Sequence, residues 1–183
     1  KAKVNPDNQA RGLPAMDLIG EANLVLGTGR YSFEHVSTLG DTTLDIEGAV
    51  SIFIDGDLEA VGTQNLRLAP GATLDLYVAG NVDLVGDTEF GGEPGRFRLY
   101  IGGQSPVAVS VGNQKLRGSI YAPEAELSFV GDTLVEGALF AKSLTGVGTL
   151  EIRHASVAAP SAAVCDVPVE LPVEVPAADA GTG

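Results

Sequence analysis

Three carboxylates occupy alternate positions in the segment IDGDLE, namely Asp55, Asp57 and Glu59. In an extended strand alternate side chains project to one side, and several carboxylate oxygens together form the kind of site that Ca²⁺ prefers. One repeat further along the chain, the matching positions 79, 81 and 83 hold only one carboxylate, so the acidic array does not continue. We therefore interpret these residues as a solvated face and expect no metal site and no cofactor.

Catalytic groups are equally sparse. The two histidines, His35 and His154, lie more than 100 residues apart and neither belongs to a metal-spaced pair. No GxSxG nucleophile elbow is present, and the 11 basic residues are spread along the chain rather than clustered with acids as in a polysaccharide lyase. We expect no catalytic residues and a protein that is not an enzyme, with a lyase as the least favoured alternative.

Charge and hydropathy limit the partners. The 183 residues include 24 acidic and 11 basic side chains, which give a net charge of −13. Nucleic acids and anionic membrane surfaces both require basic patches, so we expect neither as a partner. No apolar run of about 20 residues is present to cross a membrane. The first residues, KAKVNPDNQARG, lack the apolar segment of a signal peptide, so the protein is expected either to be cytosolic or to have lost a leader already.

The triplet Gly-Asp-Thr occurs three times, beginning at Gly40, Gly86 and Gly131, at intervals of 46 and 45 residues. Partial copies lie between and after them, so that the series of landmark glycines is Gly40, Gly62, Gly86, Gly112, Gly131 and Gly148. A series of aromatic residues runs in phase with these glycines: Tyr31, Phe53, Tyr77, Tyr100, Tyr121 and Phe140. A sequence repeat of about 20 residues is typical of a solenoid.

Apolar and polar residues alternate between these landmarks, for example in Leu74-Asp75-Leu76, which predicts strands with one buried and one wet face. We predict an all-β fold, a right-handed parallel β-solenoid of about six coils. An ordinary β-sandwich would not keep the landmarks in register. The six aromatic residues are expected to form a ladder in the core, and the Gly-Asp-Thr turns a ladder at one corner, where Asp and Thr can bond the backbone of the neighbouring turn.

The repeat also predicts the organisation of the chain. Residues 1–20 carry two prolines and no register, and are expected to form an N-terminal cap or arm. Residues 21–157 are predicted to form the β-solenoid, and residues 158–183 a linker and an extended tail rich in Pro and Val. The single cysteine, Cys165, lies in this tail, where it is either an inert thiol or an interchain bridge in an oxidising compartment.

The solenoid segment resembles a group of secreted bacterial β-helix domains. The similarity covers about residues 29–157 and includes YVAGNV at 77–82, GSIYAPEAEL at 118–127 and GALFAKSL at 137–144. In that group a "lyvaGnv" segment precedes "GxiyAPxAxv", and such domains occur in pilus-assembly-like and anchored cell-surface proteins. The resemblance implies an extracellular or cell-surface location without catalysis. In architecture alone the chain is also loosely similar to bactofilins, β-helices that polymerise end to end.

The tail segment VPVELPVEVP at 167–176 alternates strictly between apolar residues and Pro or Glu. Its apolar face consists of Val167, Val169, Leu171, Val173 and Val175. Because proline has no amide hydrogen, a strand formed here could pair along one edge only. We expect it to dock on a neighbouring subunit; docking on its own coils and a disordered polyproline-like spacer are the alternatives.

These observations lead to two functional expectations. The first is a non-enzymatic, extracellular structural protein that self-assembles into a filament or surface layer through stacking of solenoids and addition of the tail strand. Its partner is then a second copy of the chain. The alternative is a monomeric cell-surface adhesin or carbohydrate-binding β-helix, whose partner is a surface polysaccharide.

Overall fold

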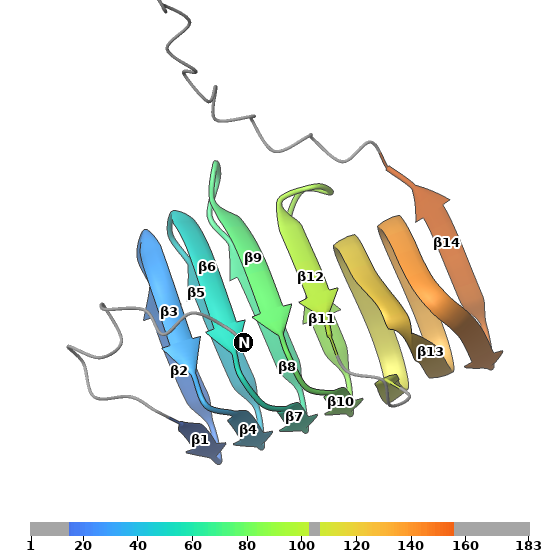
Figure 1. Ribbon diagram of the computed structural model, residues 1–183, viewed down its shortest axis with the longest axis horizontal. Coiled ribbons are helices and arrows are strands. Elements are labelled where there is room, and N and C mark those ends of the chain that lie inside the picture. Colours follow the sequence, from blue (N-terminus) through green and yellow to red (C-terminus); the bar gives the residue numbers. More distant parts are fainter. Residues whose placement is uncertain (1–14, 103–106, 156–183) are drawn as a thin grey trace, which may run out of the picture.

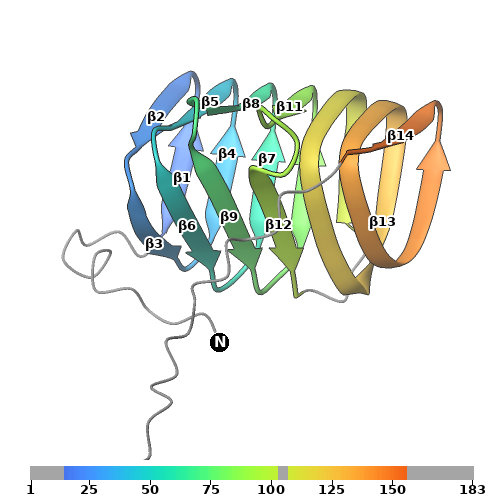
Figure 2. The same ribbon diagram turned by 90° about the horizontal axis from the view of Figure 1, so that it is seen from above.

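The computed structural model describes residues 15–102 and 107–155, and within them the chain is entirely strand and turn. The strands follow one another around a common axis, and each pairs in parallel with a strand of the next turn (Figures 1 and 2). The chain is therefore a parallel β-solenoid, as the repeat predicts.

Each turn has three strands, and the solenoid accordingly has three faces. The first face contains β1 (Met16–Ile19), β4 (Val36–Leu39), β7 (Leu58–Val61) and β10 (Val82–Val85). The second contains β2 (Ala22–Leu26), β5 (Thr42–Ile46), β8 (Gln64–Leu68) and β11 (Thr88–Phe90). The third contains β3 (Gly29–Phe33), β6 (Ala49–Ile54), β9 (Thr73–Val78) and β12 (Phe97–Ile101).

These twelve strands form four turns, whereas about six coils were expected from the sequence. The difference arises because β13 (Val107–Val147) continues the winding as one long bent strand. It pairs with β10, β11 and β12 on one side and with β14 (Leu150–His154) on the other. The solenoid also begins earlier than the expected boundary at residue 21, because β1 already pairs with β4.

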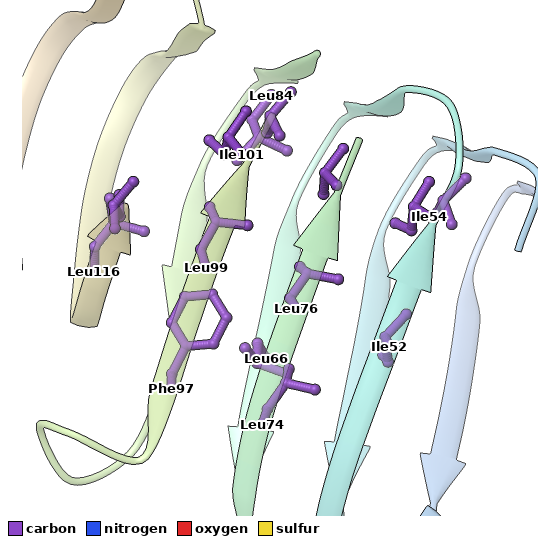
Figure 3. Packing of buried hydrophobic residues seen from close by; sticks show 14 of the residues in the cluster. Ile52, Ile54, Leu66, Leu74, Leu76, Leu84, Phe97, Leu99, Ile101 and Leu116 are labelled. Carbon is purple, nitrogen blue, oxygen red and sulfur yellow. The ribbon is translucent and has the colours of Figure 1, made fainter. Parts of the chain in front are cut away.

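Alternation along the strands creates the core. On the third face Ile52, Leu76 and Leu99 are in register on successive strands and all point inward (Figure 3). Phe97 and Leu74 form a neighbouring inner pair, and both are almost completely buried. Because strands in a sheet are spaced by about 4.8 Å, each inner side chain packs on its equivalents in the turns before and after.

The glycine landmarks are a consequence of this spacing. Gly40, Gly62, Gly86, Gly112, Gly131 and Gly148 stack at the corner between the first and second faces, together with Gly20, which the sequence series did not include. All seven have a positive φ, and a Cβ added at any of the six landmark glycines would lie against the backbone of the preceding glycine. Only glycine fits a corner where successive backbones approach this closely.

The residue after the glycine ties one turn to the next. Asp41 Oδ1 accepts a hydrogen bond from the Thr63 amide at 3.3 Å, and Asp87 Oδ1 accepts one from the Asn113 amide at 3.0 Å. This confirms for aspartate the expectation that the polar residues of the triplet bond the neighbouring turn. The third position of the triplet points inward instead, where Thr42, Thr88 and Thr133 are buried.

The aromatic ladder exists, but its expected place in the core is wrong. Five members are in one column on the outer side of the third face: Phe53, Tyr77, Tyr100, Tyr121 and Phe140. Tyr31 is not part of this column, because it pairs with Ile52 and is buried in the core. The inner positions beside the column are occupied by Ile52, Leu76, Leu99 and Ile120, and alternation therefore directs the adjacent rings outward.

We predict that Gly62→Ala destabilises the solenoid more than Gly71→Ala. Both glycines have a positive φ, which for alanine costs about 1–2 kcal/mol. A Cβ at position 62 would also overlap the carbonyl oxygen of Gly40, whereas nothing lies within 4 Å of one at position 71. The expected loss for Gly62→Ala in the free energy of unfolding, measured by denaturant titration, is about 3 kcal/mol or more. Equal losses for the two variants would show that the corner can open to admit a side chain.

Candidate functional site

The outer aromatic column is a stack of rings. Ring centroids are 4.8 Å apart between Phe53 and Tyr77, 4.6 Å between Tyr77 and Tyr100, and 5.0 Å between Tyr121 and Phe140, with interplanar angles of 5°, 7° and 11°. Tyr100 and Tyr121 are 6.3 Å apart and tilted. The stacked rings cover one another's faces, so the column presents mainly ring edges to solvent. This arrangement favours a stabilising role over a platform on which sugars stack.

An ion pair lies beside the column. Arg98 donates through Nε and Nη2 to the two carboxylate oxygens of Asp75, with Nη2 and Oδ2 2.7 Å apart. This hydrogen bond raises the pKa of Arg98. Burial raises the pKa of Tyr77, and the negative charge of the nearby Asp75 carboxylate raises it further. The pair thus fixes the outer surface of β9 and β12 next to the rings.

The N-terminal end of the solenoid leaves apolar residues of its inner columns partly exposed. Met16, Leu18 and Leu24 occupy inner positions of the first turn but are only half-buried. No described strand pairs with the outer edge of β1, β2 or β3. A cavity of about 100 Å³ runs inward from Met16, Leu18 and Leu24 and reaches Leu84 and Phe97 in the fourth turn. The apolar interior is therefore accessible at this end within the described chain.

The C-terminal end is open in the same way. Ile152 is in register with the fully buried Val135 yet is itself exposed. Leu144 is likewise exposed. It lies four residues before the corner glycine Gly148, just as Met16 lies four residues before Gly20. Within the residues that the structure describes, β14 has a partner on one side only.

One outer column has exposed apolar members at both ends of the solenoid. Its described members are residues that immediately precede corner glycines, and we call them the pre-glycine column: Ile19, Leu39, Val61, Val85, Val130 and Val147; the side chain before Gly112 lies outside the described ones. Its two terminal members are the most exposed, Ile19 at 83 % and Val147 at 70 %. Sequence reasoning missed this column, although the signal, an apolar residue before each landmark glycine, is plain in LVGDT and FVGDT.

The two ends differ in charge. The first turn, residues 16–34, contains Asp17, Glu21 and Glu34 against a single Arg30. The last turn, residues 138–155, contains Lys142 and Arg153 against a single Glu151. The C-terminal end is thus slightly basic in a protein of net charge −13, and the N-terminal end is acidic.

A polar groove of about 450 Å³ crosses the second face towards its C-terminal end. Hydroxyl, amide and charged side chains line it, including Asn65, Glu89, Lys115 and Glu151. Lys115 Nζ and Glu89 Oε1 are 3.6 Å apart in this groove. Such a mixture of donors and acceptors suits a neutral, hydroxyl-rich ligand.

The acidic segment IDGDLE is divided between a corner and a strand. Asp57 Oδ1 accepts a hydrogen bond from the Asn81 amide at 2.6 Å, while Glu59 lies on β7. His35 Nε2 is 3.2 Å from Asp17 Oδ1, and His154 is exposed at the end of β14. Across residues 15–102 and 107–155, no group of three His, Cys, Asp or Glu is placed to hold a metal ion.

Comparison with known proteins identifies the family of this chain. Residues 2–157 match the family "Domain of unknown function (DUF7305)". The chain belongs to this family. No curated protein and no solved structure matches it.

In the described part of the chain, no helix is long and apolar enough to span a membrane. Cys165 and the predicted assembly tail, Val167, Val169, Leu171, Val173 and Val175, lie outside the described residues.

We predict that Tyr77→Ala costs about 1–2 kcal/mol, the scale of two lost ring contacts on a half-exposed face. Phe97→Ala should cost about 3–5 kcal/mol, because that ring is fully enclosed in the core. Chemical denaturation of both variants measures the difference. A loss for Tyr77→Ala as large as that for Phe97→Ala would contradict the outward orientation of the column.

Proposed function

We propose that this protein is a non-enzymatic structural protein that assembles head to tail into a filament or surface layer. The observation that carries the proposal is the match between the two ends of the solenoid. The pre-glycine column is apolar at both ends, and its terminal residues, Ile19 and Val147, are its most exposed members. If a second copy continued the solenoid, these two side chains would stack on each other.

The same register would match two inner columns. Leu144 would meet Met16 of the next copy, because both lie four residues before a corner glycine. Ile152 would meet Leu24, because both belong to the inner column that includes Leu44 and Leu66 on the second face. Each contact would bury apolar surface that is exposed or half-exposed in the single chain, which is favourable by about 25 cal/mol per Å².

Charge is compatible with this contact. In the continued register Glu151 would lie over Asn23, and Arg153 over Val25, so that no like charges meet on the second face. On the first face Asp17 would lie next to the threonine at 145, and at the corner Glu21 would lie next to the threonine at 149. The negative charges of two acidic copies would therefore not oppose each other at this contact.

Geometry makes the assembly open-ended. The two contacting surfaces are different ends of the same molecule, and a head-to-tail contact along the solenoid axis leaves both outer ends free for further copies. Unpaired strand edges at such ends otherwise invite uncontrolled association. Controlled stacking or strand addition by the segment at 167–176 would satisfy these edges, in the manner of β-augmentation.

An extracellular or cell-surface location is part of the proposal. It rests on the resemblance of residues 29–157 to domains of secreted and anchored bacterial proteins.

We predict that the double variant Ile19→Asp/Val147→Asp assembles poorly. Placing carboxylates on both ends of the pre-glycine column would oppose the stacking contact, and a loss of ~1.4 kcal/mol raises the concentration needed for assembly about tenfold. Electron microscopy and sedimentation velocity on the full chain measure the change. Val61→Asp/Val85→Asp is the matched control, since it adds the same two charges in the middle of the same column. Equal behaviour of the two double variants would overturn stacking through the ends.

We predict a separate effect for the tail. Deleting residues 160–183, or changing Val169, Leu171 and Val173 together to Asp, should leave the β-rich circular dichroism spectrum unchanged and weaken assembly. The reason is the loss of a one-edged apolar strand that can pair with a neighbouring copy. Should both variants assemble at the same protein concentration as the unaltered chain, the tail is a spacer and the contact resides in the coils.

The polar groove on the second face favours a second candidate function, a monomeric adhesin or carbohydrate-binding β-helix. Its hydroxyl, amide and carboxylate groups could hydrogen-bond a surface polysaccharide. A protein that remains monomeric at all concentrations and co-sediments with an insoluble polysaccharide would favour this function over assembly.

A further inference from the structure

The first four residues of the pre-glycine column form an exposed apolar ridge on the first face. Ile19, Leu39, Val61 and Val85 are paired in sequence on β1, β4, β7 and β10. Leu39, Val61 and Val85 are 55 %, 44 % and 40 % exposed, although Leu39 and Val61 each have a column neighbour on both sides. Four aliphatic side chains in an unbroken outer row require more explanation than a single exposed residue does.

Carboxylates border this ridge on both sides. Two residues before the ridge, on the same strands, lie Asp17, Glu59 and Asp83. Two residues after it, beyond the corner glycines, lie Glu21, Asp41 and Asp87. The four strands contain no lysine or arginine. From a neighbouring segment, His35 Nε2 lies 3.2 Å from Asp17 Oδ1.

The spacing of the ridge selects the shape of the partner. Its side chains recur at the strand spacing of about 4.8 Å along the solenoid axis. An α-helix lying along that axis presents one apolar residue per turn at about 5.4 Å, so three to four turns stay close to register. An extended strand in the same direction presents one at about 6.6 Å and falls out of step after the first contact.

We propose that the ridge is a docking site for a basic amphipathic helix of another protein. Such a helix carries an apolar row that lies along Ile19, Leu39, Val61 and Val85, with lysine or arginine on either side facing the two rows of carboxylates. Two copies of this chain do not pack ridge against ridge, because that contact would bring carboxylate rows against carboxylate rows. The complementary charge would also accelerate the encounter and make binding dependent on salt.

The test uses the full chain and a fluorescent 14-residue peptide of leucine and lysine, with leucines at helical spacing. A peptide of the same composition in scrambled order is the control probe. The ridge variant is Leu39→Ser/Val61→Ser, and the border variant is Glu59→Gln/Asp83→Asn. The control protein, Val25→Ser/Tyr121→Ser, removes apolar side chains of comparable exposure from the other two faces. Fluorescence anisotropy gives the dissociation constants, and thermal melts verify that every variant is folded.

We expect saturable binding of the helical peptide that weakens about tenfold in the ridge variant, equivalent to ~1.4 kcal/mol. The border variant should reduce the dependence of binding on salt, while the control protein binds as the unaltered chain does. Equal binding of the scrambled peptide, or unchanged binding in the ridge variant, would show attraction to net negative charge alone and overturn the proposal. Concentration-dependent association without peptide that the ridge variant abolishes would identify a second copy as the occupant and overturn it as well.

Discussion

The close approach of successive turns at the glycine corner is the constraint on which the rest of the structure depends. Each landmark glycine lies against the carbonyl of the glycine one turn earlier, in a conformation with positive φ. A side chain at this position would push the turns apart and break the register of all three faces. Where an aspartate follows the glycine, as at Asp41 and Asp87, its carboxylate accepts a hydrogen bond from an amide of the next turn.

Because the register is fixed, equivalent positions of successive turns form columns along the solenoid. Inside, this produces rows of aliphatic residues such as Ile52, Leu76 and Leu99, which fill the core by stacking. Outside, it produces the stacked rings from Phe53 to Phe140, the pre-glycine column and the carboxylate rows beside it. Outer columns are therefore extended surfaces with one repeating chemistry, and such surfaces suit elongated partners better than small ligands.

A solenoid also differs from a closed fold in having two ends where stacking stops. Met16 and Leu24 at one end, and Leu144 and Ile152 at the other, occupy inner positions without a complete covering turn in the described chain. In the register that a second copy would adopt, these apolar residues would meet one another. The acidic N-terminal end would then face the slightly basic C-terminal end of the next copy. Assembly would thus use the interaction that holds the turns of a single chain together.

The sequence by itself determined that the chain is a parallel β-solenoid, because the interval between glycines and the alternation of apolar residues require stacked turns. It also located the corner and the function of its aspartates. Only the tertiary structure decided which side of each strand faces the core. The periodicity of the aromatic residues is the same whether the rings point in or out, and the aliphatic residues beside them, Ile52 and Leu76 among them, proved to be the inner set. The exposure of Ile19 and Val147 likewise depends on where stacking begins and ends, which no repeat within the chain can specify.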